Sequence, residues 1–288
     1  MLISKNLITT TLLLSCISTV WAGSQFYGAS LDKAKWRTSG NRLECRLRQN
    51  IPGYGSASFK QHALQTIEFS IAPNYSSRKS SQALLFINPP NWKRYANRTV
   101  LGRVPLSTNK EAIVVPEDWA IRISLELREG MEAVWSHADF ADAKDVITAK
   151  VMPMTFEPAW RDFVVCTENL IDYSYSDVKY STFYFNKKSM RLNRAERKKL
   201  DRLAEYVLLD TDYEFIKINS HTDSRGVRGK NLATSKRRAN MIKNYLVKKG
   251  VNRNSFVINA RGEKKPKYNN RTRLGRAKNR RIEISLVK

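Results

Sequence analysis

Residues 214–250 read EFIKINSHTDSRGVRGKNLATSKRRANMIKNYLVKKG, and their pattern organises the region around them. The first seven residues, Glu214 to Ser220, predict an apolar strand. A helix is predicted from about Gly229 to Lys249, where small and apolar side chains recur every three or four positions, and Gly250 ends it. The stripe expected to be buried comprises Leu232, Ser235, Ala239, Ile242 and Leu246. The polar segment His221–Gly226 therefore joins the end of a strand to the start of a helix.

The segments on either side extend this pattern. An apolar strand is expected around Thr182 to Phe185, and a helix begins at Asn193, which has Glu196 three residues later. This spacing is typical of a capping box, in which two side chains satisfy free backbone amides at the helix start. Further strands are expected at Ser255–Ala260 and Arg281–Val287. The order β-α-β-α-β-β predicts helices packed on a mixed sheet.

The N-terminal half has a different pattern, in which apolar and polar side chains alternate along three stretches. Such alternation predicts antiparallel strands. The stretches are marked by Leu43, Cys45 and Leu47, by Ile67, Phe69 and Ile71, and by Ile121, Ile123, Leu125 and Leu127. A short helix is expected between Asp139 and Ile147. The predicted fold class is α+β, with a mainly antiparallel β domain at 23–168, a linker at 169–177 and a second domain at 178–288.

The first 22 residues resemble a signal peptide. Lys5 precedes an apolar stretch from Leu7 to Val20, and Ala22 ends a cleavage site of small residues. We expect cleavage after Ala22 and export. The alternative is a lipobox at Leu13–Cys16, which would make Cys16 the lipidated first residue. No later stretch approaches the roughly 20 apolar residues that a transmembrane helix needs, so no transmembrane span is predicted.

Two cysteines, Cys45 and Cys166, remain once the leader is removed. Exported proteins meet an oxidising compartment, so we expect a disulfide between them. Two buried free thiols are the alternative.

The formal net charge of +25 raises nucleic acid as the first candidate partner. Export removes that partner and leaves the anionic cell-wall polymer, lipid headgroups or an acidic protein. A basic surface that only aids solubility is the alternative.

Asp223 and Arg238 are the candidate binding residues. Asp223 lies just past the predicted strand, and Arg238 lies beside Ala239 on the helix, so we expect Arg238 at the rim of a small cleft opposite Asp223. A ligand with an ammonium and a carboxylate on one carbon fits this pair, because Asp223 accepts from the ammonium and the guanidinium grips the carboxylate with two hydrogen bonds. The alternative is that Asp223 and Arg238 pair with each other or with neighbours.

The residues around this pair resemble the peptidoglycan-binding signature of the OmpA-like family, over roughly residues 178–288. The matched positions are His221-Thr222-Asp223, Gly226, Asn231, Ser235, Arg238-Ala239, Gly262, Pro266, Asn270, Thr272, Gly275-Arg276 and Asn279-Arg280-Arg281-Ile282-Glu283-Ile284. Members of that family bind diaminopimelate in the peptide stem of peptidoglycan. The resemblance implies that Asp223 and Arg238 hold its amino and carboxylate groups, with Asn231 and Thr222 nearby.

The N-terminal half resembles the MotY family, the T-ring components of sodium-driven flagellar motors. The similarity lies in residues 45–59, CRLRQNIPGYGSASF, in Cys166 and in the order of the two domains. It implies a periplasmic location beside the flagellar basal body and the outer membrane. The N-terminal domain would dock on the basal-body ring and a MotX-like protein, and the C-terminal domain would tie the ring and the stator complex to peptidoglycan. A general cell-envelope linker unrelated to motility is the alternative.

The sequence predicts no catalytic site, no metal site and no cofactor. His62, His137 and His221 are too scattered to indicate a metal site, and no cysteine remains free as a nucleophile. His221, Asp223 and Ser224 lie too close along the chain to supply a separated base, orienting group and nucleophile. We therefore expect a binding protein rather than an enzyme.

Overall fold

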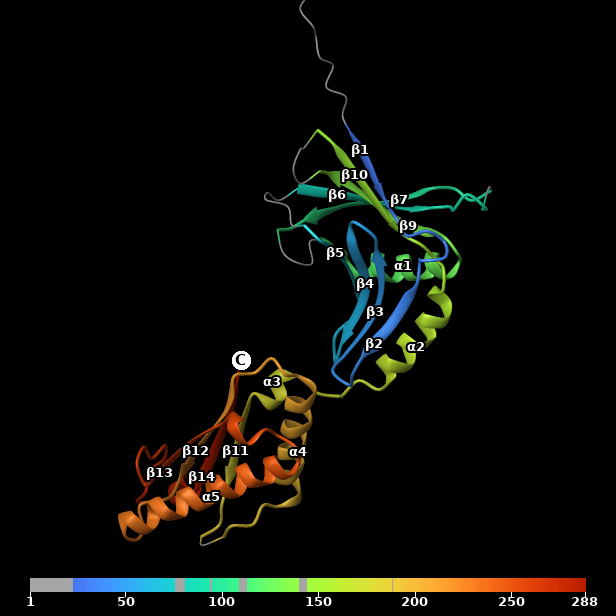
Figure 1. Ribbon diagram of the computed structural model, residues 1–288. Helices are drawn as coiled ribbons and strands as arrows, with labels where there is room; N and C mark the ends of the chain where they lie inside the picture. Colours follow the sequence, from blue (N-terminus) through green and yellow to red (C-terminus); the bar gives the residue numbers. More distant parts are fainter. Residues whose placement is uncertain (1–22, 76–80, 94, 109–112, 140–143, 188) are drawn as a thin grey trace, which may run out of the picture.

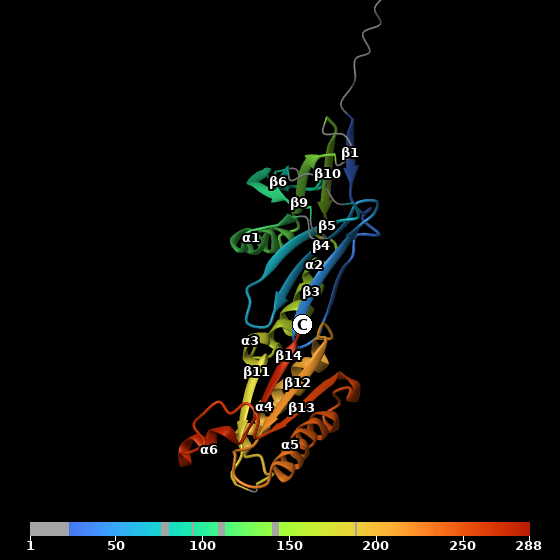
Figure 2. The same ribbon diagram turned by 90° about the vertical axis from the view of Figure 1, so that its left-hand side faces the viewer.

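The structure is a computed structural model, shown in Figure 1 and from a second direction in Figure 2. It describes residues 23–75, 81–93, 95–108, 113–139, 144–187 and 189–288. The predicted leader, with Cys16 and Ala22, lies outside the described residues. The chain forms two regions, one above the other in Figure 1, and each is built around its own apolar core.

Two five-stranded sheets make up the N-terminal region, with the orders β1-β10-β9-β6-β7 and β2-β3-β4-β5-β8. The strands of the first are β1 Ser24–Tyr27, β10 Val146–Val151, β9 Glu132–Ala138, β6 Ser81–Asn88 and β7 Thr99–Leu106. Those of the second are β2 Trp36–Gly40, β3 Glu44–Ile51, β4 Gly55–His62, β5 Glu68–Pro73 and β8 Ile113–Val114. All neighbouring strands are antiparallel except β1 and β10, which confirms the predicted mainly antiparallel β fold.

The core of the N-terminal region is rich in aromatic side chains. The ring of Phe59 on β4 lies 4.7 Å from that of Phe69 on β5 and 5.7 Å from that of Phe156, the first residue of helix α2 (Phe156–Glu168). Trp36 on β2 meets Phe156 edge to face at 5.0 Å. All four rings are buried, so apolar packing holds α2 against the second sheet.

The predicted strand that contains Ile121 and Leu125 is wrong, because these residues lie in helix α1 (Glu117–Arg128). Ile123 and Leu127 are buried, whereas Ile121 and Leu125 are exposed. Side chains four residues apart, such as Ile123 and Leu127, lie on the same face in a strand and in a helix. The apolar pattern therefore does not distinguish a strand from a helix here. Two acidic residues in the first turn favour the helix, because they interact with the positive end of its dipole.

The helix expected between Asp139 and Ile147 is also wrong where the structure describes this segment. Ile147 lies in strand β10, which pairs with β9 so that Val146 is opposite Ala138. Residues 140–143 lie outside the described residues. Pairing with a neighbouring strand is a tertiary contact, and it overrides a weak local preference.

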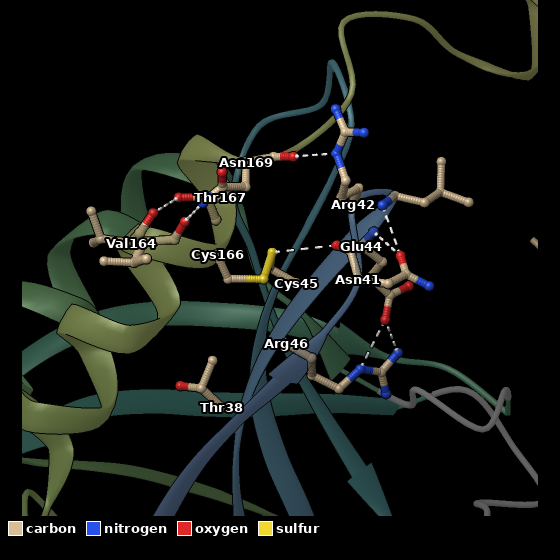
Figure 3. The surroundings of a disulfide bond; sticks show 12 residues. Thr38, Asn41, Arg42, Glu44, Cys45, Arg46, Val164, Cys166, Thr167 and Asn169 are labelled. Atoms are coloured by element: carbon tan, nitrogen blue, oxygen red, sulfur yellow. Dashed lines mark hydrogen bonds and ion pairs between the residues drawn. A yellow bond between two sulfur atoms is a disulfide. The ribbon is translucent and has the colours of Figure 1, made fainter. Parts of the chain in front are cut away.

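A disulfide joins Cys45 on β3 to Cys166 near the end of α2, as predicted (Figure 3). Their Cα atoms are 6.0 Å apart, although the residues are separated by 121 positions. Cys45 is completely buried. The bond ties the second sheet to α2, next to the point where the chain leaves the N-terminal region.

The C-terminal region contains one mixed sheet with the order β11-β14-β12-β13. Its strands are β11 Tyr180–Tyr184, β14 Arg281–Val287, β12 Phe215–His221 and β13 Phe256–Gly262. Strands β12 and β13 are parallel, and the other two pairs are antiparallel. Helices α4 (Arg194–Leu209) and α5 (Arg228–Lys248) share one buried apolar cluster with these strands. The predicted order of elements and the mixed sheet are confirmed.

The ends and faces of the helices follow the sequence signals closely. Oδ1 of Asn193 accepts from the N–H of Glu196 at 2.8 Å, and the N–H of Asn193 donates to Oε2 of Glu196 at 2.8 Å, so the capping box is confirmed. The buried stripe of α5 is confirmed except at Leu232, which is 50% exposed. Helix α2 lies outside the predicted pattern, as do three short helical segments: α3 (Tyr175–Val178), the 3₁₀ helix η1 (Arg253–Ser255) and α6 (Arg273–Asn279).

The two regions touch along residues 169–177, which we propose as the linker. The N–H of Ile171 donates to the carbonyl of Arg42 at 2.8 Å, and the side chains of Arg42 and Glu205 form an ion pair. Ala63, just beyond β4, is buried in the apolar cluster of the C-terminal region. These contacts hold the end of the second sheet against α4.

Helix α5 has 21 residues and carries many basic side chains. None of the helices in the described ranges combines the length and the apolar character needed to cross a membrane.

We expect Cys45→Ser to lower the free energy of unfolding by about 4 to 5 kcal/mol, the chain-entropy value for so long a loop. Urea denaturation of the purified proteins under non-reducing conditions measures this loss. The double variant Cys45→Ser/Cys166→Ser is the control, because it removes the unpaired thiol, and it should lose the same amount. Equal unfolding midpoints for wild type and both variants would contradict a stabilising role for the disulfide.

Candidate functional site

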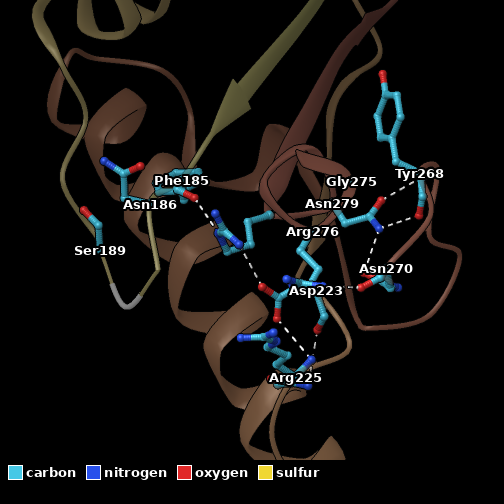
Figure 4. Close-up of polar contacts among 12 residues, drawn as sticks. Phe185, Asn186, Ser189, Asp223, Arg225, Tyr268, Asn270, Gly275, Arg276 and Asn279 are labelled. Carbon is cyan, nitrogen blue, oxygen red and sulfur yellow. Dashed lines mark hydrogen bonds and ion pairs between the residues drawn. The ribbon is translucent and has the colours of Figure 1, made fainter. Parts of the chain in front are cut away.

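Asp223 lies just beyond β12, as predicted, with 8% of its surface exposed. Its Oδ1 accepts a hydrogen bond from the backbone N–H of Arg225 at 3.1 Å. Its Oδ2 accepts from Nη1 of Arg280 at 2.8 Å, and this contact is also an ion pair (Figure 4). These donors replace the water that the carboxylate loses on burial.

The expected position of Arg238 at a rim is wrong, because its side chain is buried, with 2% exposed. Nη2 donates to the backbone carbonyls of Asn186 at 3.3 Å and Ser189 at 3.1 Å, and Cζ lies 4.7 Å from the centre of the Phe185 ring. Its Nε has no hydrogen-bond partner among the described residues. Burial is the main cause that lowers the pKa of Arg238 to about 10, and repulsion from Arg280 is the second cause.

Arg280, the residue after α6, takes the position opposite Asp223 that the sequence pattern assigned to Arg238. Its Nε donates to the carbonyl of Phe185 at 2.9 Å while its Nη1 holds Asp223. Asp223 therefore pairs with a neighbouring side chain, which is the alternative to a free carboxylate given for it above. Arg280 is not among the binding residues predicted from the sequence, although the matched motif Asn279-Arg280-Arg281 contains it.

A cavity of about 580 Å³ opens beside Asp223. One carboxylate and five basic side chains line it, and the lining residues are Asn186, Lys187, Asp223, Arg225, Arg273, Arg276, Ala277 and Arg280. Among the predicted binding residues only Asp223 belongs to this lining. The arrangement can accept an ammonium at Asp223 and carboxylates at the guanidiniums.

Asn231 and Thr222 brace the segment around Asp223. Nδ2 of Asn231 donates to Oε2 of Glu263 at 2.6 Å and to the carbonyl of Asp223 at 3.4 Å. The N–H of Thr222 donates to the carbonyl of Gly262 at 2.8 Å, whereas its Oγ1 has no partner in the part of the chain that the structure describes. Both residues are largely buried, and they hold the backbone around Asp223 in place.

Asn279 holds the loop before α6 in place, and its side chain is completely buried. Oδ1 accepts from the N–H groups of Lys267 and Tyr268 at 3.0 Å each. Nδ2 donates to the carbonyl of Tyr268 at 2.7 Å and to Oδ1 of Asn270 at 2.8 Å. All the hydrogen-bonding positions of the amide are therefore used.

The same loop fixes Arg276 at the cavity. Nη1 of Arg276 donates to the carbonyls of Asn270 at 2.8 Å and Arg271 at 2.7 Å. The backbone packs so closely here that a Cβ atom at Gly275 would lie 1.9 Å from the carbonyl oxygen of Asn269. Only glycine fits at this position, because the clash is with backbone rather than with a movable side chain.

The described residues contain no group of three or more His, Cys, Asp or Glu side chains placed to hold a metal ion. Nε2 of His137 lies 3.0 Å from the hydroxyl of Tyr54, and Nδ1 of His221 lies 3.2 Å from the carbonyl of Lys264. Burial lowers the pKa of both imidazoles. Each is engaged within the fold and not in a shared site.

Comparison with known families divides the chain into two matches. Residues 27–171 match the MotY N-terminal domain, and residues 184–280 match the OmpA family. The first match alone covers half of the 288 residues. The chain belongs to the MotY family. The sodium-type flagellar protein MotY of Vibrio parahaemolyticus is 25% identical to it over 98% of this chain and 98% of that protein, so both resemblances seen in the sequence are confirmed.

The C-terminal region of this MotY-family chain is similar to OmpA-family proteins. Outer membrane protein A of Bordetella avium is 36% identical over 36% of this chain and 53% of that protein. The crystal structure of the peptidoglycan-associated lipoprotein from Burkholderia pseudomallei is 26% identical, covers 36% of this chain and 88% of that one, and gives a TM-score of 0.35. The OmpA-family match, residues 184–280, contains the whole lining of the cavity.

We expect Asn279→Asp to lower the free energy of unfolding by about 2 to 3 kcal/mol, because it removes two donated hydrogen bonds and sets a carboxylate against the carbonyl of Tyr268. Urea denaturation followed by circular dichroism measures the change. Asn259→Asp is the matched control, since among the described residues its amide makes one hydrogen bond, to Asn219 at 3.0 Å. The free energy of unfolding should fall by less than about 1 kcal/mol in this variant. Equal losses of unfolding free energy in the two variants would show that the buried hydrogen bonds of Asn279 stabilise the fold no more than the single bond of Asn259.

Proposed function

We propose that the protein binds peptidoglycan through its C-terminal region and ties the T ring of the flagellar motor to the cell wall. The observation that carries this proposal is Asp223, a single carboxylate in a cavity whose other charged groups are basic. The ammonium of diaminopimelate fits Asp223, and the carboxylate on the same carbon fits the basic side chains that line the cavity.

The four binding residues inferred from sequence have different tasks in this proposal. Asp223 contacts the ammonium, while Asn231 and Thr222 keep Asp223 in place. Arg238 supplies positive charge from behind the cavity, and it reaches a ligand carboxylate only where the carbonyls of Asn186 and Ser189 release it.

The proposed activity is binding without catalysis and without a cofactor. Both oxygens of Asp223 accept hydrogen bonds from the protein. The carboxylate is therefore placed to bind a cationic group rather than to act as a nucleophile. Nδ1 of His221 lies against the carbonyl of Lys264, so this nitrogen is engaged within the fold.

We propose that the N-terminal region docks on the basal-body ring, with a MotX-like protein and the stator complex as further partners. The match to the MotY N-terminal domain and the similarity to a sodium-type flagellar protein along nearly the whole chain support this. The proposed location is the periplasm, beside the basal body and the outer membrane, where nucleic acid is not a partner. The proposed units are the leader at 1–22, the docking domain at 23–168, the linker at 169–177 and the wall-binding domain at 178–288.

We expect Asp223→Asn to abolish co-sedimentation with purified sacculi, because a neutral amide of the same shape cannot form an ion pair with an ammonium. The fraction of purified protein that pellets with sacculi measures this. Asp162→Asn, which changes an exposed acid on α2, is the control and should pellet like wild type. Undiminished pelleting of a folded Asp223→Asn protein would defeat the proposed site. Arg238→Ala is a poorer probe, because emptying a buried position also destabilises the fold.

We expect a strain that lacks the protein to lose swimming while its wall integrity stays that of the parent strain. Full-length protein should restore swimming, and Asp223→Asn should restore it only in part, because the ring then lacks its wall contact. Soft-agar spreading and detergent sensitivity, scored in parallel, measure the two traits. Intact swimming in the deletion strain would remove the motor function and favour a general envelope linker.

A further inference from the structure

Three arginines gather near the carboxylate of Asp223, and backbone carbonyls hold all of them. Arg238 and Arg280 donate to carbonyls in the segment just after β11, and Arg276 donates to two carbonyls of the loop before α6. Their guanidiniums are therefore positioned before any ligand arrives. A preorganised group loses little side-chain entropy when it binds.

Arg276 and Arg280 keep donors available at the cavity. A guanidinium has five N–H groups. On Arg280 one of them meets the carbonyl of Phe185 and one meets Asp223, and on Arg276 two meet carbonyls. The other N–H groups of both side chains have no acceptor among the described residues, and they are enough for a two-bond grip on a carboxylate.

The charges of this cavity are unbalanced. Its lining has five basic side chains and one carboxylate, and the buried Arg238 lies close enough to be repelled by Arg280. The carbonyls that hold the guanidiniums also prevent them from moving apart. A zwitterion has no net charge and would leave the imbalance unchanged, whereas an additional carboxylate on the ligand would reduce it.

We propose a second carboxylate subsite in this cavity, formed by Arg276 and Arg280. The inference rests on the proposed function and deepens it, because it defines the ligand as a stem peptide with the zwitterionic end of diaminopimelate and one further free carboxylate. Asp223 accepts the ammonium without releasing Arg280, since a carboxylate has about four lone-pair positions and two are occupied. Amidation of the further carboxylate weakens binding.

Calorimetric titration of the processed full-length chain with two synthetic peptides tests this subsite. Both peptides contain diaminopimelate with a free amino acid end, and they differ only in a carboxylate or a carboxamide at the C-terminus. We expect wild type to bind the carboxylate peptide at least about tenfold more tightly, the effect of one charge-assisted pair. Arg280→Gln should reduce this ratio to about twofold, because it weakens binding of the carboxylate peptide more than that of the carboxamide peptide.

Three further variants make the result specific. Arg253→Gln removes an exposed charge outside the cavity and should keep the wild-type ratio. Arg280→Lys keeps the charge without the two-bond grip and should give an intermediate ratio. Thermal melts establish whether each variant is folded. If Arg280→Gln is not folded, Arg276→Gln replaces it, and the same affinity ratio is expected.

Two results would overturn the second subsite: equal wild-type affinity for the two peptides, or an unchanged ratio in the folded glutamine variant. Failure of wild type to bind either peptide would instead overturn the proposed function. The two failures are therefore distinguishable in one set of titrations.

Discussion

The ion pair between Asp223 and Arg280 is the contact on which the candidate site depends. Its partners are 57 positions apart, one just beyond β12 and one just beyond α6, so it forms only when the sheet and both connections are in place. Both side chains are largely removed from water, with 17% and 11% exposed for Arg280 and Asp223. Loss of either partner leaves a largely buried charge without its ion-pair partner, which is more costly than loss of a surface pair.

The N-terminal region is held together by different forces, and it is joined firmly to the C-terminal region. Aromatic rings and a disulfide fix helix α2 on the second sheet. Glu205 on α4 then receives both the guanidinium of Arg42 and the hydroxyl of Tyr173, the latter at 2.6 Å. These contacts join α4 to Arg42, just before β3, and to Tyr173 in the segment between the two regions.

Local signals predicted much of the C-terminal fold and less of the N-terminal one. Asn193 and Glu196 marked a helix start correctly, because a capping box involves residues only three apart. The alternation at Ile121 to Leu127 indicated a strand, yet these residues form part of α1, because side chains four apart share a face in both structures. Helix α6 escaped prediction because its seven residues carry no apolar stripe, and backbone packing at Gly275 and the amide of Asn279 hold it instead.

The sequence alone determined the order of elements in the C-terminal region, the pairing of Cys45 with Cys166 and the position of Asp223 at a strand end, because each follows from spacing, periodicity or the count of available cysteines. Only the tertiary structure decided which guanidinium meets that carboxylate. Arg238 is covered by carbonyls 52 and 49 positions earlier in the chain, while Arg280 comes beside Asp223 through a helix that local patterns do not show. Exposure depends on what packs over a side chain, and that information lies in contacts between distant residues rather than in neighbouring ones.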